Sequence, residues 1–358
     1  MSSLCSAVEI IPLWQSGMDG YDTYRIPAVV VTTNGTLLAF CEGRKNSRSD
    51  TGNIDLLVKR SQDQGKTWSQ QAVIWDDAGN TCGNPCPIVD RETGSVFLLM
   101  TWNRGDDHES AIIAEKSKDT RRIFVTLSKN DGISWGQPME ITSQTKKSDW
   151  TWYATGPGAG IQIERGPQSG RLVAPCDHIE AKTKKYYSHV IYSDDHGLTW
   201  KLGGRTVRDQ VNECQVVELS QNRLMLNMRN YDPTHRFRQI AFSANGGLSW
   251  QEQNFDQRLV EPICQASLRA YSWTSDGKRA ILLFSNPASK SRRENMTVRS
   301  SIDEGITWTT QWILNPGPSA YSDLAFLNSS TGICLFEGGN KHPYETIFFA
   351  KFPIHQNK

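Results

Sequence analysis

The sequence lacks the features that mark membrane, nucleic-acid-binding and multidomain chains. No apolar run reaches the about 18 residues that a membrane-spanning helix needs, and the first ten residues contain no apolar segment typical of a secretory signal. Charge of one sign does not dominate, since 39 Lys and Arg face 38 Asp and Glu, which argues against a nucleic-acid partner. No long amphipathic helix, linker or low-complexity tract is evident. We therefore expect one domain over residues 1–358, with no transmembrane segment.

Cysteine pairs and metal-ligand clusters are also missing from the sequence. The eight cysteines are scattered through apolar, strand-like surroundings, at positions 5, 41, 82, 86, 176, 214, 264 and 334. Buried free thiols are expected, which favours the cytoplasm, although a lysosomal or secreted location stays open. Cys82 and Cys86 could instead pair or bind a metal, but no His or Cys cluster accompanies them. The seven His are dispersed, so we expect no metal and no cofactor.

A repeat of eight residues is the strongest signal that is present. Its pattern is Ser, any residue, Asp or Asn, any residue, Gly, any residue, Thr or Ser, Trp. Five copies occur, at Ser61–Trp68, Ser128–Trp135, Ser193–Trp200, Ser243–Trp250 and Ser301–Trp308. Successive copies start 67, 65, 50 and 58 residues apart, a spacing that suits a propeller blade of four short strands.

Each fixed position of the repeat has a structural reading. The Asp or Asn accepts backbone N–H groups within a turn, the Gly adopts a backbone conformation that other residues resist, and the Trp packs between blades. Between the repeats the chain is strand-like, and Asn34-Gly35 predicts a hairpin. The sequence thus predicts an all-β, six-bladed β-propeller. The sixth blade would join the termini, with a strand near residues 9–13 pairing with strands near 333–352.

Further motifs lie between the repeats. They are Tyr24-Arg25-Ile26-Pro27, Glu42-Gly43-Arg44 with Asp50, Asn212-Glu213-Cys214-Gln215, Met228-Arg229-Asn230, Arg293-Glu294-Asn295-Met296-Thr297 and Tyr321-Ser322-Asp323-Leu324. Together with the repeats, which resemble Asp boxes, these motifs resemble the sialidase (neuraminidase) superfamily in family order over nearly the whole chain. Asn84-Pro85-Cys86-Pro87 and Glu213-Cys214-Gln215 are similar to animal cytosolic sialidases in particular.

The resemblance implies an exo-α-sialidase that hydrolyses terminal α-linked sialic acids with retention of configuration. Sialic acid carries a carboxylate on its anomeric carbon, which would repel an anionic nucleophile, and sialidases use a tyrosine instead. By resemblance Tyr321 is the nucleophile of a sialyl-tyrosine intermediate, and Glu213 is the base that a phenol with a pKa near 10 requires. Asp50 matches the acid/base residue. Asp55 is an alternative acid, although its strand-like setting favours a structural role.

The same resemblance implies a clamp of Arg25, Arg229 and Arg293 on the substrate carboxylate, because guanidinium groups bind carboxylates in a bidentate manner. Arg292 is adjacent to Arg293, whose spacing to the following motif fits the family better. Arg44 is expected near the carboxylate, and Asn84 is a candidate for the pocket of the N-acyl group.

Other readings remain open at this point. A trans-sialidase would share every catalytic residue, and a non-catalytic sialic-acid-binding propeller or an interaction scaffold would keep the repeats. The expected partners are sialylated glycans, glycoproteins or gangliosides. Trp102, Tyr153 and residues 177–187 could line the aglycone or glycerol side. The sequence does not predict the preferred linkage, the sialic acid variant or the oligomeric state.

Overall fold

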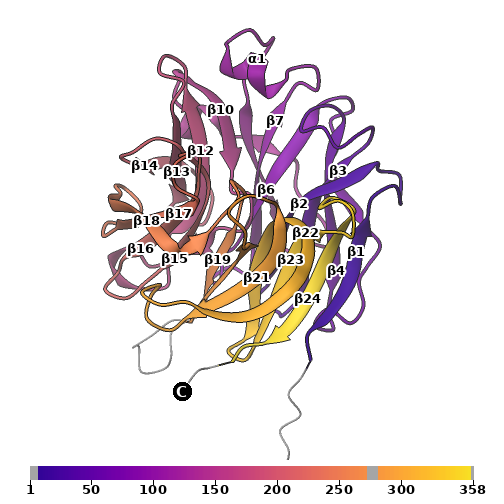
Figure 1. Cartoon of the computed structure of the whole chain (residues 1–358). Coiled ribbons are helices and arrows are strands. Elements are labelled where there is room, and N and C mark those ends of the chain that lie inside the picture. Colours follow the sequence, from indigo (N-terminus) through magenta and orange to yellow (C-terminus); the bar gives the residue numbers. More distant parts are fainter. Residues whose placement is uncertain (1–6, 272–280, 356–358) are drawn as a thin grey trace, which may run out of the picture.

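The structure is a computed structural model that describes residues 7–271 and 281–355, and in these residues it is all-β, as predicted. Its strands form four sheets (Figure 1). The short helical elements are α1 (Glu109–Ile113), α2 (Thr142–Thr145) and the 3-10 turn η1 (Gly166–Gln168). No helix in the described ranges has the length and apolar character needed to cross a bilayer.

The first half of the chain forms an eight-stranded and a five-stranded sheet. The first contains β2 (Thr23–Val31), β3 (Leu37–Arg44), β4 (Ile54–Ser61), β5 (Ala72–Trp75), β6 (Thr81–Val89), β7 (Val96–Asn103), β8 (Arg122–Ser128) and β9 (Met139–Glu140). The second contains β10 (Trp150–Thr155), β11 (Ile161–Gln162), β12 (Leu172–Glu180), β13 (Tyr186–Ser193) and β14 (Lys201–Arg205). In the eight-stranded sheet, β4 and β6 are joined by one parallel pair, Ile54 with Thr81.

The second half forms a four-stranded and a seven-stranded sheet. The four-stranded sheet contains β15 (Val211–Glu218), β16 (Leu224–Asn230), β17 (Phe237–Ser243) and β18 (Gln251–Val260). The seven-stranded sheet contains β1 (Glu9–Gln15), β19 (Ser267–Ala270), β20 (Leu282–Pro287), β21 (Glu294–Ser301), β22 (Thr309–Asn328), β23 (Thr331–Gly338) and β24 (Thr346–Pro353). The 20-residue β22 pairs with β21 through its first half and with β23 through its second half.

The two ends of the chain close on each other. Strand β1 pairs antiparallel with β24, with Glu9 opposite Lys351 and Ile10 opposite Ala350. In Figure 1 the indigo β1 accordingly lies beside the yellow β24. This confirms the predicted pairing of the N-terminal strand with the C-terminal strands.

The five repeats form turns, as predicted. Each begins at the last residue of a strand: β4, β8, β13, β17 or β21. In the first, Asp63 accepts hydrogen bonds from the Thr67 backbone N–H (2.9 Å) and hydroxyl (2.6 Å), while the Ser61 hydroxyl accepts from the Gly65 N–H (2.9 Å). Asn130 replaces Asp in the second repeat and accepts the equivalent backbone bond at 3.0 Å.

The Trp of each repeat packs against the core: Trp200 and Trp250 are buried, and Trp68, Trp135 and Trp308 are half-buried. Trp68 meets Phe349 of β24 at a ring-centroid distance of 5.2 Å, and Trp200 meets Phe97 of β7 at 6.3 Å. Each contact joins a repeat turn to a strand of another sheet. Gly65 has φ +86°, and a Cβ there would lie 2.4 Å from the Phe349 ring. The turn thus needs glycine for both backbone conformation and close packing.

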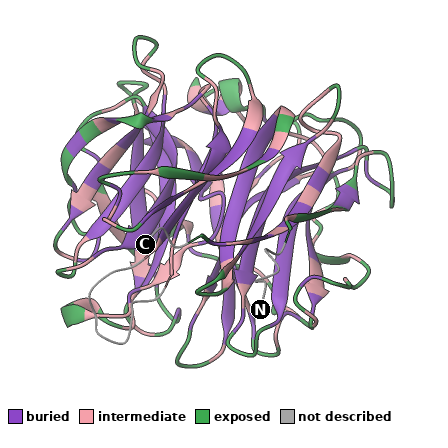
Figure 2. Ribbon diagram, turned by 60° about the horizontal axis from the view of Figure 1, so that its bottom comes forward, coloured by how far each residue is buried: buried purple, intermediate pink, exposed green. Residues whose placement is uncertain are grey.

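The strand register places the repeats far from the residues with predicted chemistry. Arg44 pairs with Ile54 at one end of β3 and β4, and Leu37 pairs with Ser61 at the other end. Seven residues at about 3.3 Å each separate these ends by about 23 Å. Buried strands lie between them, with exposed residues concentrated in the loops (Figure 2). The seven described cysteines are free and buried, and Cys5 lies outside the described residues.

Candidate active site

One cavity of about 210 Å³ opens at the end of the strands away from the repeats. All eight residues singled out in the sequence line it: Arg25, Arg44, Asp50, Asn84, Glu213, Arg229, Arg293 and Tyr321. Ten of the 18 lining residues are arginines, aspartates or glutamates, five basic and five acidic, and polar surface predominates. The site is therefore suited to a polar, charged ligand.

Irregular pairing aims several side chains into this cavity. The register shifts in β2, β6, β10, β15 and β22 where each of these strands passes the cavity. The shifts span the positions of Arg25–Ala28, Gly83–Cys86, Trp150–Tyr153, Val211–Cys214 and Ser319–Ser322. A bulge re-aims a side chain at the cost of regular pairing, and bulges are frequent beside active sites. Five strands thus each present a residue to one cavity.

Tyr321, Glu213 and Arg229 form a hydrogen-bonded group on the cavity floor. The Tyr321 hydroxyl donates to Glu213 Oε1 at 2.6 Å and accepts from Arg229 Nη1 at 3.0 Å. Arg229 Nη1 also pairs with Glu213 Oε2 at 2.6 Å. Glu213 is thus in position to take the phenolic proton, and Arg229 contacts both the phenol and this carboxylate.

Burial and the neighbouring Glu213 raise the pKa of Tyr321 well above its ordinary value, although Arg229 and Arg293 act in the opposite direction. The phenol is only 6% exposed. Tyr321 is therefore protonated in the resting protein. It becomes a nucleophile only if Glu213 removes the proton as the new bond forms.

Arg25 is held by a buried carboxylate that the motifs did not reveal. Glu337 on β23 pairs with Arg25 Nε at 2.7 Å and accepts the Ile26 and Tyr321 backbone N–H groups at 2.8 and 3.1 Å. Burial by itself would lower the pKa of Arg25, but Glu337 outweighs it and raises that pKa. Ile26 has φ +59°, a strained conformation for a β-branched residue. Glu337 therefore holds both the Arg25 side chain and the backbone of Tyr321.

Arg293, the residue just before β21, is the third arginine near Tyr321. Its guanidinium donates to the Tyr344 hydroxyl at 2.9 Å and to the Ile263 carbonyl at 3.3 Å. The Arg25 guanidinium lies 3.9 Å from the centroid of the same Tyr344 ring. Glu337 balances Arg25 and Glu213 balances Arg229, whereas Arg293 has no acidic partner within ion-pair distance among the described residues. The Arg293 guanidinium is thus left without a counter-ion, which suits one carboxylate ligand.

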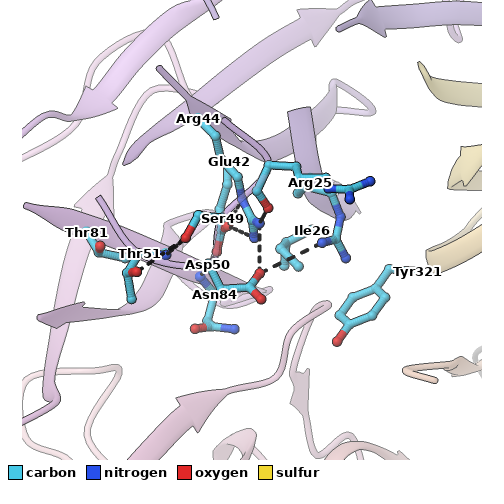
Figure 3. Close-up of polar contacts among 12 residues, drawn as sticks. Arg25, Ile26, Glu42, Arg44, Ser49, Asp50, Thr51, Thr81, Asn84 and Tyr321 are labelled. Carbon is cyan, nitrogen blue, oxygen red and sulfur yellow. Dashed lines mark hydrogen bonds and ion pairs between the residues drawn. The ribbon is translucent and has the colours of Figure 1, made fainter. Parts of the chain in front are cut away.

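Asp50 lies in the loop between β3 and β4 and faces two arginines. Its Oδ1 is 2.7 Å from Arg44 Nη1 and 3.8 Å from Arg25 Nη1. Figure 3 shows both guanidinium groups directed at this carboxylate, with Glu42 on the other side of Arg44. Burial opposes the charged form, yet Arg44 and Arg25 together lower the pKa of Asp50. Its side chain is 69% exposed, so it can reach an incoming ligand and water.

Asn84 and Arg121 form the next part of the wall. Asn84 has φ +55°, and its side-chain oxygen accepts hydrogen bonds from Arg121 and from the Thr101 hydroxyl. The Arg121 guanidinium stacks 4.0 Å from the Trp152 ring centroid. Burial lowers the pKa of Arg121 to about 10. Since the Asn84 oxygen is already occupied, the amide N–H₂ is the part of this side chain left to bind a ligand.

Several further lining residues had no individual role assigned from the sequence: Glu42 and Asn212, which lie within quoted motifs, and Glu109, Trp152, Asp177, Tyr231 and Tyr344, which do not. Asp177 belongs to the stretch 177–187 that the sequence offered for the glycerol side, and it does line the cavity. Trp102 and Tyr153 do not. Trp102 donates to Asp77 at 2.7 Å, and Tyr153 is fully buried against His189.

Two alternatives from the sequence are also placed by the structure. Asp55 is buried, accepts a 2.6 Å hydrogen bond from Tyr21 and pairs with Lys45 at 3.2 Å, away from the cavity lining. Arg292 is exposed, whereas Arg293 lines the cavity. The structure therefore favours Asp50 over Asp55 and Arg293 over Arg292 as lining residues of the cavity.

Among the described residues there is no group of three His, Cys, Asp or Glu arranged to hold a metal.

Comparisons with known proteins point to one family. A family profile described as a BNR repeat-like domain matches residues 35–333. The chain is 33% identical over 346 residues to a sialidase of Micromonospora viridifaciens, which covers 94% of this chain but 53% of that protein's length. It is 32% identical over 399 residues to Sialidase-3 of Mus musculus, covering 96% of this chain and 93% of the mouse protein.

A solved structure gives the same answer for the fold. The Hadza microbial sialidase Hz136 superposes with a TM-score of 0.83 at 30% identity, over 95% of this chain and 67% of that one. The similarity agrees with a propeller-like, all-β architecture.

Proposed function

Because this chain belongs to the sialidase family of glycoside hydrolases, we propose that it releases terminal α-linked sialic acids from glycoconjugates with retention of configuration. The charge of the arginine cluster carries this proposal. Arg25, Arg229 and Arg293 meet around Tyr321, and of these three Arg293 has no acidic partner within ion-pair distance among the described residues. A sugar with a carboxylate on its anomeric carbon would supply the missing anion and would place that carbon beside the phenol.

In the first step the Tyr321 oxygen forms a bond to the anomeric carbon while the glycosidic C–O bond breaks. Glu213 accepts the phenolic proton over the 2.6 Å hydrogen bond. Asp50, on the exposed side of the site, donates a proton to the departing oxygen. Because Arg25 and Arg44 lower the pKa of Asp50, its protonation requires that the substrate carboxylate first neutralise part of this positive charge.

In the second step water replaces the tyrosine. The Asp50 carboxylate takes a proton from a water molecule, which attacks the anomeric carbon as the bond to Tyr321 breaks. Glu213 then returns the proton to the phenolate. Two displacements at one carbon give net retention.

We further propose that the sheets form six blades in one domain spanning residues 1–358. Dividing the eight-stranded sheet at its one-residue parallel link, and the seven-stranded sheet within β22, gives six units. They comprise β2–β5, β6–β9, β10–β14, β15–β18, β19–β22, and β22–β24 with β1. Five of these units carry a repeat, and the closure through β1 supports the sixth.

The proposed partners are sialylated glycans on glycoproteins or gangliosides. The free, buried state of the seven described cysteines supports a reducing compartment such as the cytoplasm. No residue in the site calls for a cofactor in the proposed steps.

The direct test is release of free sialic acid from α2,3-, α2,6- and α2,8-linked substrates, with matched N-acetyl, N-glycolyl and KDN sugars. We expect hydrolysis of at least one linkage, with the α-anomer appearing first by proton NMR. Release of a β-anomer first, or binding without release, would refute the proposal. Transfer to an added lactose acceptor in place of hydrolysis would instead identify a trans-sialidase.

A further inference from the structure

Arg238 and Glu261 form a buried ion pair outside the cavity lining. Arg238, on β17, is 0% exposed, and Glu261, which directly follows β18, is 1% exposed. Arg238 Nη1 lies 2.7 Å from Glu261 Oε2. Burying two charges is costly, and an apolar pair of similar volume often stabilises a fold equally well. The directed bonds of this pair therefore require an explanation beyond stability.

The guanidinium group of Arg238 joins strand β16 to the segment between β18 and β19. Its Nε donates to Asn227 Oδ1 at 2.7 Å, and its Nη2 faces the Asn227 carbonyl at 3.5 Å. Its Nη1 also donates to the Cys264 carbonyl at 2.8 Å. One planar group thus fixes two parts of the chain relative to each other.

Glu261 extends this hold to the residue after Arg229. The pairing of β16 with β17 ends at Met228. Beyond that point Glu261 Oε1 accepts the backbone N–H of Asn230 at 2.5 Å. Arg229 therefore lies between two residues of β16, Asn227 and Asn230, that the buried pair holds.

The segment Glu261–Cys264 contains a strained residue. Ile263 follows Pro262 and has φ +56°. A proline followed by a positive φ is typical of a type II turn, in which the position of Ile263 favours Gly or Asn. A β-branched residue persists in this conformation only if its surroundings fix it. Arg238 provides this restraint, because it binds both ends of the segment.

The strained residue presents its carbonyl to the clamp. Arg293 Nη2 donates to the Ile263 carbonyl at 3.3 Å, and Arg293 Nη1 donates to the Tyr344 hydroxyl at 2.9 Å. Both acceptors are neutral, and no carboxylate within the described ranges forms an ion pair with Arg293. The direction of this guanidinium therefore depends on where the Ile263 carbonyl is held.

We propose that the Arg238–Glu261 pair is the positioning element of the clamp: it holds Ile263 in its strained conformation and so fixes Arg293 relative to Arg229. The pair contacts no ligand and acts only through the Ile263 carbonyl and strand β16. This inference rests on the proposed function, because it takes Arg229 and Arg293 to bind one carboxylate.

The test compares Arg238→Lys with Arg171→Lys. Lysine keeps the positive charge but lacks the planar fork that reaches several acceptors at fixed angles. Arg171, at the repeat end, is the matched control, because its fork likewise binds one carboxylate, that of Asp194, and one carbonyl, that of Gly246.

Calorimetry with a dehydrated sialic acid analogue measures the effect. Arg238→Lys should bind the analogue about tenfold more weakly than wild type, the scale of one lost hydrogen bond to a charged group. Arg171→Lys should bind it within about twofold of wild type. Equal affinities of wild type and Arg238→Lys would overturn the proposal.

Ile263→Asn separates positioning from general stability. Asparagine accepts a positive φ more readily than isoleucine, so the turn depends less on the fork of Arg238. In the Arg238→Lys background this substitution should restore the affinity to within about threefold of wild type. A general loosening of the fold would not be reversed in this way, so absence of recovery would refute the positioning role.

A double-mutant cycle with Arg293→Ala tests the route of the effect. Once this guanidinium is absent, Arg238→Lys should weaken binding by less than a further twofold or so, because nothing is left to position. Additive losses would contradict the proposal. If Arg238→Lys fails to fold, Ile263→Pro tests the same contact, since proline fixes φ near about −65°. It should weaken binding about tenfold, and full affinity would overturn the inference.

The proposed function can fail separately. A wild type that neither binds the analogue nor cleaves a sialoside would refute that function. The positioning role retains its own readout in a crystal structure of Arg238→Lys, or of Arg238→Met with Glu261→Leu. There the φ of Ile263 should turn negative, and the contact of its carbonyl with Arg293 should be lost. An unchanged turn would show that the buried pair does not hold it.

Discussion

The two ends of the strands carry the same residue types but use them in opposite ways. At the repeat end, Asp63 is bound by Ser61 and Thr67, all within one eight-residue turn. At the cavity end, Asp50 depends on Arg25 and Arg44, which come from separate strands. The pKa is lowered in both aspartates. The pKa of Asp63 is lowered by hydrogen bonds within its own turn, which a ligand in the cavity does not touch. The pKa of Asp50 is lowered by arginines whose charge a bound anion would offset.

This difference separates stability from function. A turn whose polar groups bind one another contributes to folding and gains nothing from a ligand. A cavity in which the Arg293 guanidinium has no acidic partner among the described residues is costly until an anionic ligand arrives. Substitutions at the cavity end should therefore affect catalysis and binding, and substitutions at the repeat end should affect stability.

The largest effect is expected for Tyr321→Phe. Removing the hydroxyl removes the nucleophile, so turnover should fall by several orders of magnitude, while the melting temperature stays within a few degrees. In the wild type a 2,3-difluoro sialic acid reagent should form an adduct that mass spectrometry maps to Tyr321. The variant should form none. An adduct on Glu213 or Asp50 would show that the nucleophile is misassigned.

Arg229→Ala tests the clamp itself. Loss of a charged hydrogen bond of about 1.5–3 kcal/mol should weaken binding of a dehydrated sialic acid analogue at least tenfold by calorimetry. Arg292→Ala is the control, since Arg292 is a neighbouring but exposed arginine outside the cavity lining. Equal affinities of wild type and Arg229→Ala would remove Arg229 from the clamp.

The repeat end is tested by Asp63→Ala. The turn then loses the acceptor for the Thr67 N–H and hydroxyl, and the melting temperature should fall by a few degrees while kcat is unchanged. Gln62→Ala, in the same turn but exposed, should leave both unchanged. A marked loss of kcat in Asp63→Ala, measured well below its melting temperature, would show that the two ends are not independent.

The turns at the repeat end were the part of the molecule that the sequence predicted most fully. Its hydrogen bonds join residues four or fewer positions apart, so Ser61, Asp63 and Gly65 appear as a spacing that recurs. The eight candidate residues of the cavity were found because they lie in recognisable motifs. Glu337, Arg121 and Asp177 were not identified as site residues, because their positions depend on pairing between distant strands and on bulges that no local pattern marks. Asp177 was included only as the first residue of a stretch.

The smallest effect is expected in the number of protons taken up when a ligand binds. This number distinguishes Asp50 from Asp63 most directly. A bound carboxylate offsets the positive charge of Arg25, so the pKa of Asp50 should rise on binding, while that of Asp63 should stay at about 2. At a pH that lies between the pKa of Asp50 in the free protein and its pKa in the complex, the complex then holds more protons than the free protein. Binding should therefore take up a fraction of a proton below about pH 5, and affinity should increase as the pH falls through this window.

Calorimetry of the dehydrated analogue in buffers of different ionisation enthalpy measures this uptake. Asp50→Asn should abolish it and Asp63→Asn should not. Proton release on binding, or an uptake that persists in Asp50→Asn, would show that the clamp does not control the charge of Asp50.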